Sequence, residues 1–150
     1  MYNFKIIIDG DACPSINLIE ECAKKFDVPV IIITDTSHNI TSDYSNVLIV
    51  DKGSQSVDIK LINLVSSGDI VISQDYGVAV MTLSKKAYCI SPKGLIFTND
   101  NIDNLMLNRH INQKLRNSGK RVKGPKKRTN DDDKKLIESL KELIKKIKKV

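Results

Sequence analysis

Four aspartates stand at points where a parallel sheet would bring them together. Asp9 closes an apolar, strand-like segment near the N-terminus, and Asp11 lies in the turn that follows. Asp75 comes two residues after a later segment of the same kind, and Asp58 begins the helix-like stretch that leads into that segment. Because the carboxyl ends of parallel strands meet at one edge of a sheet, we expect the four side chains to share a crevice.

Carboxylates that converge in one crevice repel each other and favour a bound cation. Mg²⁺ and Mn²⁺ suit such a place, since hard cations take oxygen ligands and keep several waters. The three cysteines include no CxxC pair, and His38 and His110 are far apart in the sequence. We therefore expect oxygen to hold any metal. An ion held in this way can activate water and clamp a phosphodiester for in-line attack.

Each aspartate also has a structural interpretation. Asp58 is in a position to cap its helix, a task that Ser56 would share. Asp11 is able to fold its turn through bonds to the backbone, and Asp69, directly after Gly68, is typical of turns too. Asp9 and Asp75 are harder to explain in this way, because both follow apolar strands.

The second chemical feature is a basic run. Residues 1–100 carry a net charge of −4, whereas residues 101–150 carry +10. Gly124 and Pro125 bend the most basic stretch, and glycine permits close approach to phosphate. The cations predicted to bind nucleic acid are Arg109, Lys120, Arg121, Lys123, Lys126, Lys127 and Arg128. The run contains no aromatic residue, so we expect contacts to the phosphate backbone, with a solvated loop as the alternative.

The order of the elements predicts how these residues are positioned. Apolar strands alternate with helical segments, which favours an α/β fold with a doubly wound, mostly parallel, five-stranded sheet and helices on both faces. We expect strands at 4–8, 30–34, 47–50, 70–73 and 87–90. We expect helices at 15–26, 57–65, 75–85, 102–115 and from about residue 130 onward. Residues 1–118 would form the α/β domain, and 119–150 the basic loop and a C-terminal helix.

The apolar stripe of the last helix predicts packing on the domain or on a second copy, which makes a homodimer one expected outcome. Its members are Ile137, Leu140, Ile144 and Ile147. No apolar run is long enough for a membrane span, and the N-terminus lacks the features of a signal peptide. We therefore expect a cytoplasmic protein without a membrane partner.

Motifs along nearly the whole chain resemble the YaiI/YqxD family of small bacterial proteins. The segment Ile8-Asp9-Gly10-Asp11-Ala12-Cys13-Pro14 is similar to its opening DADACP motif. The likeness continues through the Gly68–Ala79 stretch, Ser91-Pro92-Lys93-Gly94 and the basic run from Gly119 to Thr129. Gly10 replaces the family's Ala, and Val122 replaces its usual Thr, and neither change removes a candidate ligand.

The resemblance implies a PIN-like fold, whose members hold divalent metal with clustered acids. By that likeness Asp9, Asp58 and Asp75 would be the metal ligands, and Asp11 would join them in a catalytic set. The helix-borne second acid of many PIN nucleases has no clear match, and Glu20 and Glu21 are the nearest acids on the first helix. The leading hypothesis is a Mg²⁺- or Mn²⁺-dependent nuclease that acts on RNA.

Two other functions compete with this hypothesis. The first is a nucleic-acid-binding protein that keeps the fold without turnover. The second is a phosphatase of the haloacid-dehalogenase type, suggested by Asp9-Gly10-Asp11 after the first strand, although that motif places Thr or Val where Cys13 stands. Because no histidine is near Cys13 in the sequence, we expect its thiol to pack rather than react.

Overall fold

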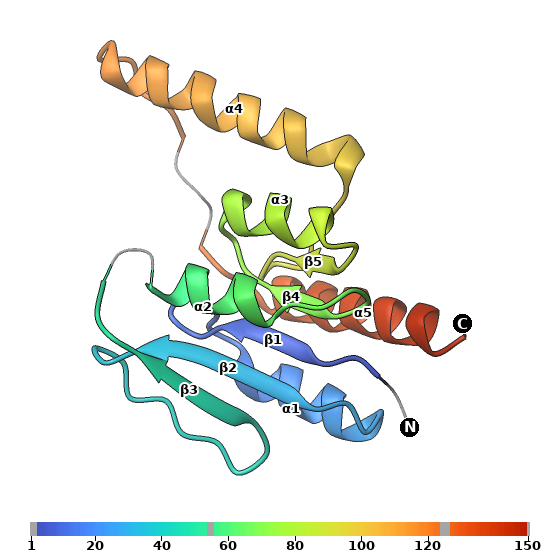
Figure 1. Ribbon diagram of the computed structural model, residues 1–150. Helices are drawn as coiled ribbons and strands as arrows, with labels where there is room; N and C mark the ends of the chain where they lie inside the picture. The colour runs from blue at the N-terminus through green and yellow to red at the C-terminus, as the bar shows by residue number, and fades with distance from the viewer. Residues whose placement is uncertain (1–2, 54–55, 124–126, 150) are drawn as a thin grey trace.

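The computed structural model describes residues 3–53, 56–123 and 127–149. In this part of the chain, parallel strands alternate with helices as the sequence predicts. The elements are β1 (Ile6–Asp9), α1 (Ile16–Lys25), β2 (Val30–Asp35), β3 (Asn46–Val50), α2 (Ser56–Leu64), β4 (Ile70–Ile72), α3 (Tyr76–Ser84), β5 (Tyr88–Ile90), β6 (Ile96–Phe97), α4 (Asn99–Asn117) and α5 (Asn130–Lys148). Figure 1 shows their arrangement.

The strands form one sheet in the order β3-β2-β1-β4-β5-β6. All neighbours are parallel except β5 and β6, which are antiparallel. The predicted α/β class with a mostly parallel sheet is confirmed, but the prediction of five strands is wrong by one. The additional strand, β6, has two residues and follows the tight turn at Gly94. A strand this short gives too little alternation to be recognised in the sequence.

Helices cover both faces of the sheet, so the doubly wound arrangement is confirmed. On one face, Ile6 and Ile8 of β1 belong to the same buried cluster as Ile19 of α1 and Leu140 of α5. On the other face, Ile7 joins residues of α2 and α3 in a second cluster. Successive strand residues point to opposite faces, which explains why β1 is apolar throughout and buried on both sides.

The apolar stripe of α5 packs into the first of these clusters. Leu136, Leu140, Leu143 and Ile144 are buried there. At the turn before β6, Gly94 has a φ of +91°, and a Cβ at this position would lie 2.6 Å from the backbone carbon of Lys135. Ser139 Oγ donates a hydrogen bond to the Gly94 carbonyl at 2.6 Å. Glycine therefore lets α5 approach this turn closely.

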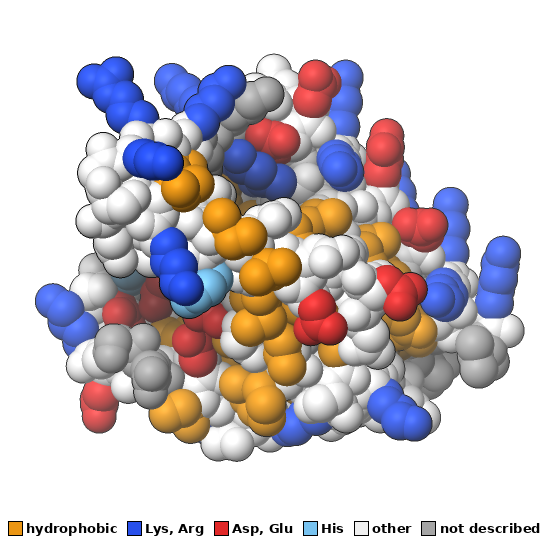
Figure 2. Space-filling view, turned by 90° about the horizontal axis from the view of Figure 1, so that it is seen from above, with side chains coloured by type: hydrophobic (Ala, Val, Ile, Leu, Met, Phe, Trp, Pro, Cys, Tyr) orange, Lys and Arg blue, Asp and Glu red, His pale blue; other side chains and the backbone are white. Residues whose placement is uncertain are grey.

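Helix α4 projects from the body, above α3 in Figure 1. A capping box formed by Thr98 and Asn101 begins it, and Ile102 is its only buried residue. Figure 2 looks down on this side and shows a band of hydrophobic side chains crossing it between lysines and arginines. Among the described residues, no helix is both long and apolar enough to cross a membrane.

Candidate functional site

The sheet has a topological switch point between β1 and β4. These two strands are neighbours, and the chain continues from β1 to β2 and β3 on one side and from β4 to β5 and β6 on the other. In sheets wound in this way, ligands bind beyond the carboxyl ends of the two central strands. Asp9 ends β1, and Ser73 directly follows β4, so both lie at this edge.

Asp9 is a buried carboxylate, with 7% of the residue exposed. Ser73 Oγ donates a hydrogen bond to its Oδ2 at 3.3 Å. Burial raises the pKa of Asp9 to about 6, and repulsion from Asp58 and Asp11 contributes to the rise, while the bond from Ser73 opposes it. A carboxylate that is desolvated and repelled in this way would be stabilised by a bound cation.

Asp75 occupies the N-cap of α3 and points into the same region. Its Oδ1 accepts a hydrogen bond from the backbone N–H of Val78 at 3.1 Å. The backbone N–H of Asp75 donates to Ser73 Oγ, also at 3.1 Å. Ser73 is therefore a positioning residue that joins Asp75 to Asp9. Sequence reasoning missed Ser73, although its place at the end of β4 is the same signal that identified Asp9.

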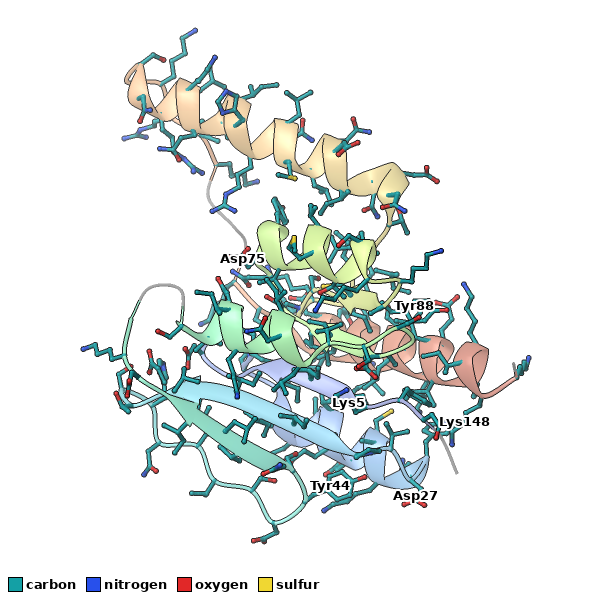
Figure 3. All side chains as sticks on the ribbon, in the orientation of Figure 1. Lys5, Asp27, Tyr44, Asp75, Tyr88 and Lys148 are labelled. Atoms are coloured by element: carbon teal, nitrogen blue, oxygen red, sulfur yellow. The ribbon has the colours of Figure 1, made fainter. Side chains whose placement is uncertain are left out.

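Asp58 lies in the first turn of α2, where the sequence predicted it. Its pKa is raised, first by burial and then by repulsion from Asp75 and Asp11. Carboxylates raise one another's pKa in this way only when they lie close together. Figure 3 shows Asp75 at the beginning of α3, near the beginning of α2. The structure thus brings Asp58 beside Asp75.

Asp11 faces a neighbouring group of polar residues. Its Oδ1 accepts hydrogen bonds from Thr34 Oγ1 at 2.7 Å and from the backbone N–H of Asp35 at 3.3 Å. His38 Nδ1 lies 3.1 Å from this oxygen and 2.9 Å from Asp35 Oδ1. Hydrogen bonds from Ser37 and His38 lower the pKa of Asp35 to about 2, and the bond to Asp35 raises the pKa of His38.

The ligand atoms of Asp11, Asp35 and His38 all lie within 4.8 Å of one another. Among the described residues, no other group of three His, Cys, Asp or Glu side chains is this compact. The predicted metal ligands Asp9, Asp58 and Asp75 do not form such a compact group among the described residues. The neighbouring cluster includes a histidine, so the expectation of oxygen ligands alone does not apply to it. Asp35 was missed, although it ends β2, the strand that pairs with β1, and so carries the same strand-end signal as Asp9.

A cleft of about 640 Å³ opens beside Asp9 and Asp75. Its floor is acidic, whereas its wall is formed by α4 and carries amides and cations. The lining residues are Asp9, Ala12, Gln74, Asp75, Tyr76, Leu105, Asn108, Arg109, Asn112, Arg116 and Lys123. Asn108, Asn112 and Arg116 are spaced four residues apart, which places them on one side of the helix. That spacing was available in the sequence and was missed.

The cations predicted to bind nucleic acid differ in their surroundings. Arg109 and Lys123 line the cleft, and the Arg109 guanidinium carbon lies 5.5 Å from the centre of the Tyr76 ring. Lys120, Arg121 and Lys127 are exposed, whereas Lys126 lies outside the described residues, as do Gly124 and Pro125.

Arg128 is held by contacts within the protein. Its Nε and one terminal nitrogen donate to Asp133 Oδ1 at 3.0 and 2.7 Å, and the other terminal nitrogen donates to the Pro92 carbonyl at 2.7 Å. Ser15 Oγ donates to the same Asp133 oxygen at 2.6 Å. These bonds tie the start of α5 to α1 and to the turn before β6.

The remaining sequence candidates have structural partners. Asp69 is buried and accepts a hydrogen bond from Lys5 Nζ at 2.7 Å and another from the Ser66 backbone at 2.8 Å, in agreement with its interpretation as a turn residue. Glu20 accepts from Ser45 Oγ at 2.6 Å and secures the segment before β3. Burial raises the pKa of the Cys13 thiol, which favours packing over reactivity.

The fold and site define a doubly wound α/β protein with an acidic crevice at its switch point. A family model described as "Uncharacterized BCR, YaiI/YqxD family" matches residues 7–146, and the chain belongs to this family. It is 54% identical to a UPF0178 protein of Clostridium kluyveri over 93% of this chain and 92% of the relative. For a UPF0178 protein of Clostridium tetani, the identity is 49% over 97% and 99%.

One solved structure is similar over most of its length. Rae1 (YacP) from Bacillus subtilis, as the W164L mutant, matches with a TM-score of 0.46 and 14% identity, over 79% of this chain and 84% of Rae1.

Proposed function

We propose that the protein is a metal-dependent nuclease that cleaves RNA. The observation that carries this proposal is the cleft at the switch point, which combines Asp9 and Asp75 with Arg109, Arg116 and Lys123. Carboxylates alone would repel a phosphodiester, and cations alone would only bind it. A cavity that has both suits a phosphate which is held by basic side chains against a divalent ion.

The donor set fits Mg²⁺ or Mn²⁺, since both prefer carboxylate oxygens. Asp9, Asp58 and Asp75 would hold the ion, because burial and then repulsion from neighbouring aspartates raise the pKa of Asp9 and of Asp58, and a bound cation would offset both effects. Asp11 would add its negative charge from the neighbouring cluster with Thr34, Asp35 and His38. Such an ion supplies Lewis acidity at the phosphate and lowers the pKa of bound water.

The chain's own residues position the substrate. Arg116 and Lys123 would neutralise phosphates along the wall of the cleft, and the amides of Asn108 and Asn112 would donate hydrogen bonds between them. Ser73 fixes the distance between Asp9 and the start of α3. The exposed Lys120, Arg121 and Lys127 would extend this path for a longer strand, and Arg128 would hold the start of α5 in place.

The test is cleavage of a labelled single-stranded RNA with Mn²⁺ or Mg²⁺ by the wild type and by Asp75→Asn. Asparagine is also a good N-cap, so α3 is retained while one charged ligand is lost. The cleavage rate should fall at least ~100-fold. Asp43→Asn, which changes an exposed carboxylate, is the matched control and should cleave like the wild type. A wild type that cleaves no RNA or DNA with either ion contradicts the proposal.

A second candidate function is nucleic-acid binding without turnover. It is favoured by the structural partners of the two acids in the cleft, because Asp75 caps α3 and Asp9 is bonded to Ser73. Tight RNA binding by a wild type that does not cleave would support it. The phosphatase alternative is not favoured, since Asp11 faces Thr34, Asp35 and His38 instead of lining the cleft with Asp9.

A further inference from the structure

Helix α4 is long but packs poorly. Of its 19 residues only Ile102 is buried, and its principal contact with the body is with α3. An isolated helix of this length is marginal in water, and helices in proteins gain most of their stability from a packed apolar face. The capping box at Thr98 and Asn101 stabilises only the first turn.

An apolar stripe on α4 faces away from the cleft. Leu107 is 54% exposed, and Ile111, four residues later, is 45% exposed. We call these two residues the outer stripe. At about 100° per residue, Leu107 lies on the opposite side of the helix from Leu105, which lines the cleft. The outer stripe and the cleft wall are therefore separate surfaces of one helix.

Charges of opposite sign stand at the two ends of the outer stripe. Asp100 and Asp103 are exposed near the start of α4, and Lys114 is exposed near its end. The helical spacing places all three on the same side as Leu107. None of them forms an ion pair within the described residues.

We propose that the outer stripe binds the outer stripe of a second copy of this chain, with the two α4 helices antiparallel. A two-fold axis through the middle of the helix makes such a contact isologous. Leu107 would pack beside the partner subunit's Ile111, and Asp103 would face the partner subunit's Lys114. In the antiparallel orientation the two helix dipoles point in opposite directions, so they attract each other. Because each cleft lies on the far side of its helix, both would remain open.

The outer side of α4 is complementary to itself, which favours a second copy of this chain over other partners. Asp103 is six residues before residue 109, the midpoint between Leu107 and Ile111, and Lys114 is five residues after it, so one surface supplies both halves of the ionic contact. A nucleic acid would be repelled by Asp100 and Asp103 at the start of the same side. The proposed contact consists of Leu107, Ile111 and the charges beside them, which is small for a stable interface, so the dimer should dissociate on dilution.

Sedimentation velocity of the full chain over a range of concentrations tests the proposal, without metal or nucleic acid. We expect a monomer–dimer equilibrium whose dissociation constant rises ~10-fold or more in Leu107→Glu. Leu107 is exposed, so this variant should fold normally, as circular dichroism would show. Ile59→Glu is the matched control, since Ile59 is 57% exposed on α2, and its dimer should equal the wild type's.

A charge exchange identifies the antiparallel pairing. Asp103→Lys and Lys114→Asp should each weaken the dimer, and the two substitutions together should restore it, because the ionic contact is re-formed with its signs reversed. A wild type that is monomeric at every concentration overturns the proposal. So does a dimer that survives Leu107→Glu, a dimer that is lost in Ile59→Glu, or a double variant that is no better than the single ones.

Discussion

At the scale of single residues, the ionisation of Asp9 couples the site to the stability of the fold. Its pKa is 3.8 when unperturbed and about 6 in the folded protein, where burial is the main cause. Between these pH values the folded state holds a proton that the unfolded chain has lost, so stability decreases as the pH rises through this window. Above about pH 6 Asp9 is ionised in both states, and the decrease in the free energy of unfolding reaches its full value of at most ~3 kcal/mol.

We therefore expect Asp9→Asn to be more stable than the wild type at neutral pH in the absence of divalent ions. The advantage should disappear as the pH falls toward 3.8, because Asp9 is then protonated in both states. Urea unfolding with a chelator, over a series of pH values, measures it. Asp43→Asn at an exposed position should show no such dependence. A wild type that is more stable than Asp9→Asn at neutral pH would contradict the assignment.

At the scale of the elements, the contact of α5 with the turn at Gly94 makes a sharp prediction. Gly94→Ala places a methyl group 2.6 to 2.7 Å from the backbone of Lys135 and Leu136, in a residue with positive φ. We expect a loss of ~3 kcal/mol or more in the free energy of unfolding, because neither backbone is free to move away. Thermal or urea unfolding provides the measurement.

Gly119→Ala is the control that distinguishes the cost of the positive φ from the cost of steric overlap with α5. Gly119 also has a positive φ, +85°, but no atom of the described residues lies within 4 Å of the position of its Cβ. Its substitution should cost only ~1 kcal/mol, from the backbone conformation alone. Equal losses of unfolding free energy in the two variants would show that α5 does not pack closely against the turn at Gly94.

The elements were largely predictable, because each follows from local patterns of apolar residues. Helix starts at Asp75 and Thr129, and the strand that ends at Asp9, are examples where a cap or an apolar run determines the structure. The candidate site was less predictable. The pairing of β1 with β2 brings Asp35 beside Asp11, and the path of α4 brings Arg116 over the cleft. Both depend on tertiary packing, which short-range patterns do not encode.

At the scale of the whole molecule, an acidic body and a basic C-terminal region meet at one cleft. If Arg116 and Lys123 contact phosphates there, Arg116→Ala with Lys123→Ala should weaken RNA binding. The slope of log K against log salt should decrease by ~1.4 for a single strand, about 0.7 for each lost contact. Fluorescence anisotropy at several salt concentrations measures this slope. Lys145→Ala with Lys149→Ala removes the same charge from exposed positions at the end of α5, and it should leave the slope nearly unchanged.

We propose that the acidic residues at the switch point hold a divalent ion, and calorimetric titration of Mn²⁺ into the full chain measures this binding. We expect binding to the wild type that weakens at least ~10-fold in Asp58→Asn, a change that preserves shape but removes a charged ligand. Binding should persist in Asp35→Asn, which alters only the neighbouring cluster. No binding to the wild type would contradict the claim. Binding that is lost in Asp35→Asn but kept in Asp58→Asn would also contradict it, because the ion would then lie at Asp11, Asp35 and His38.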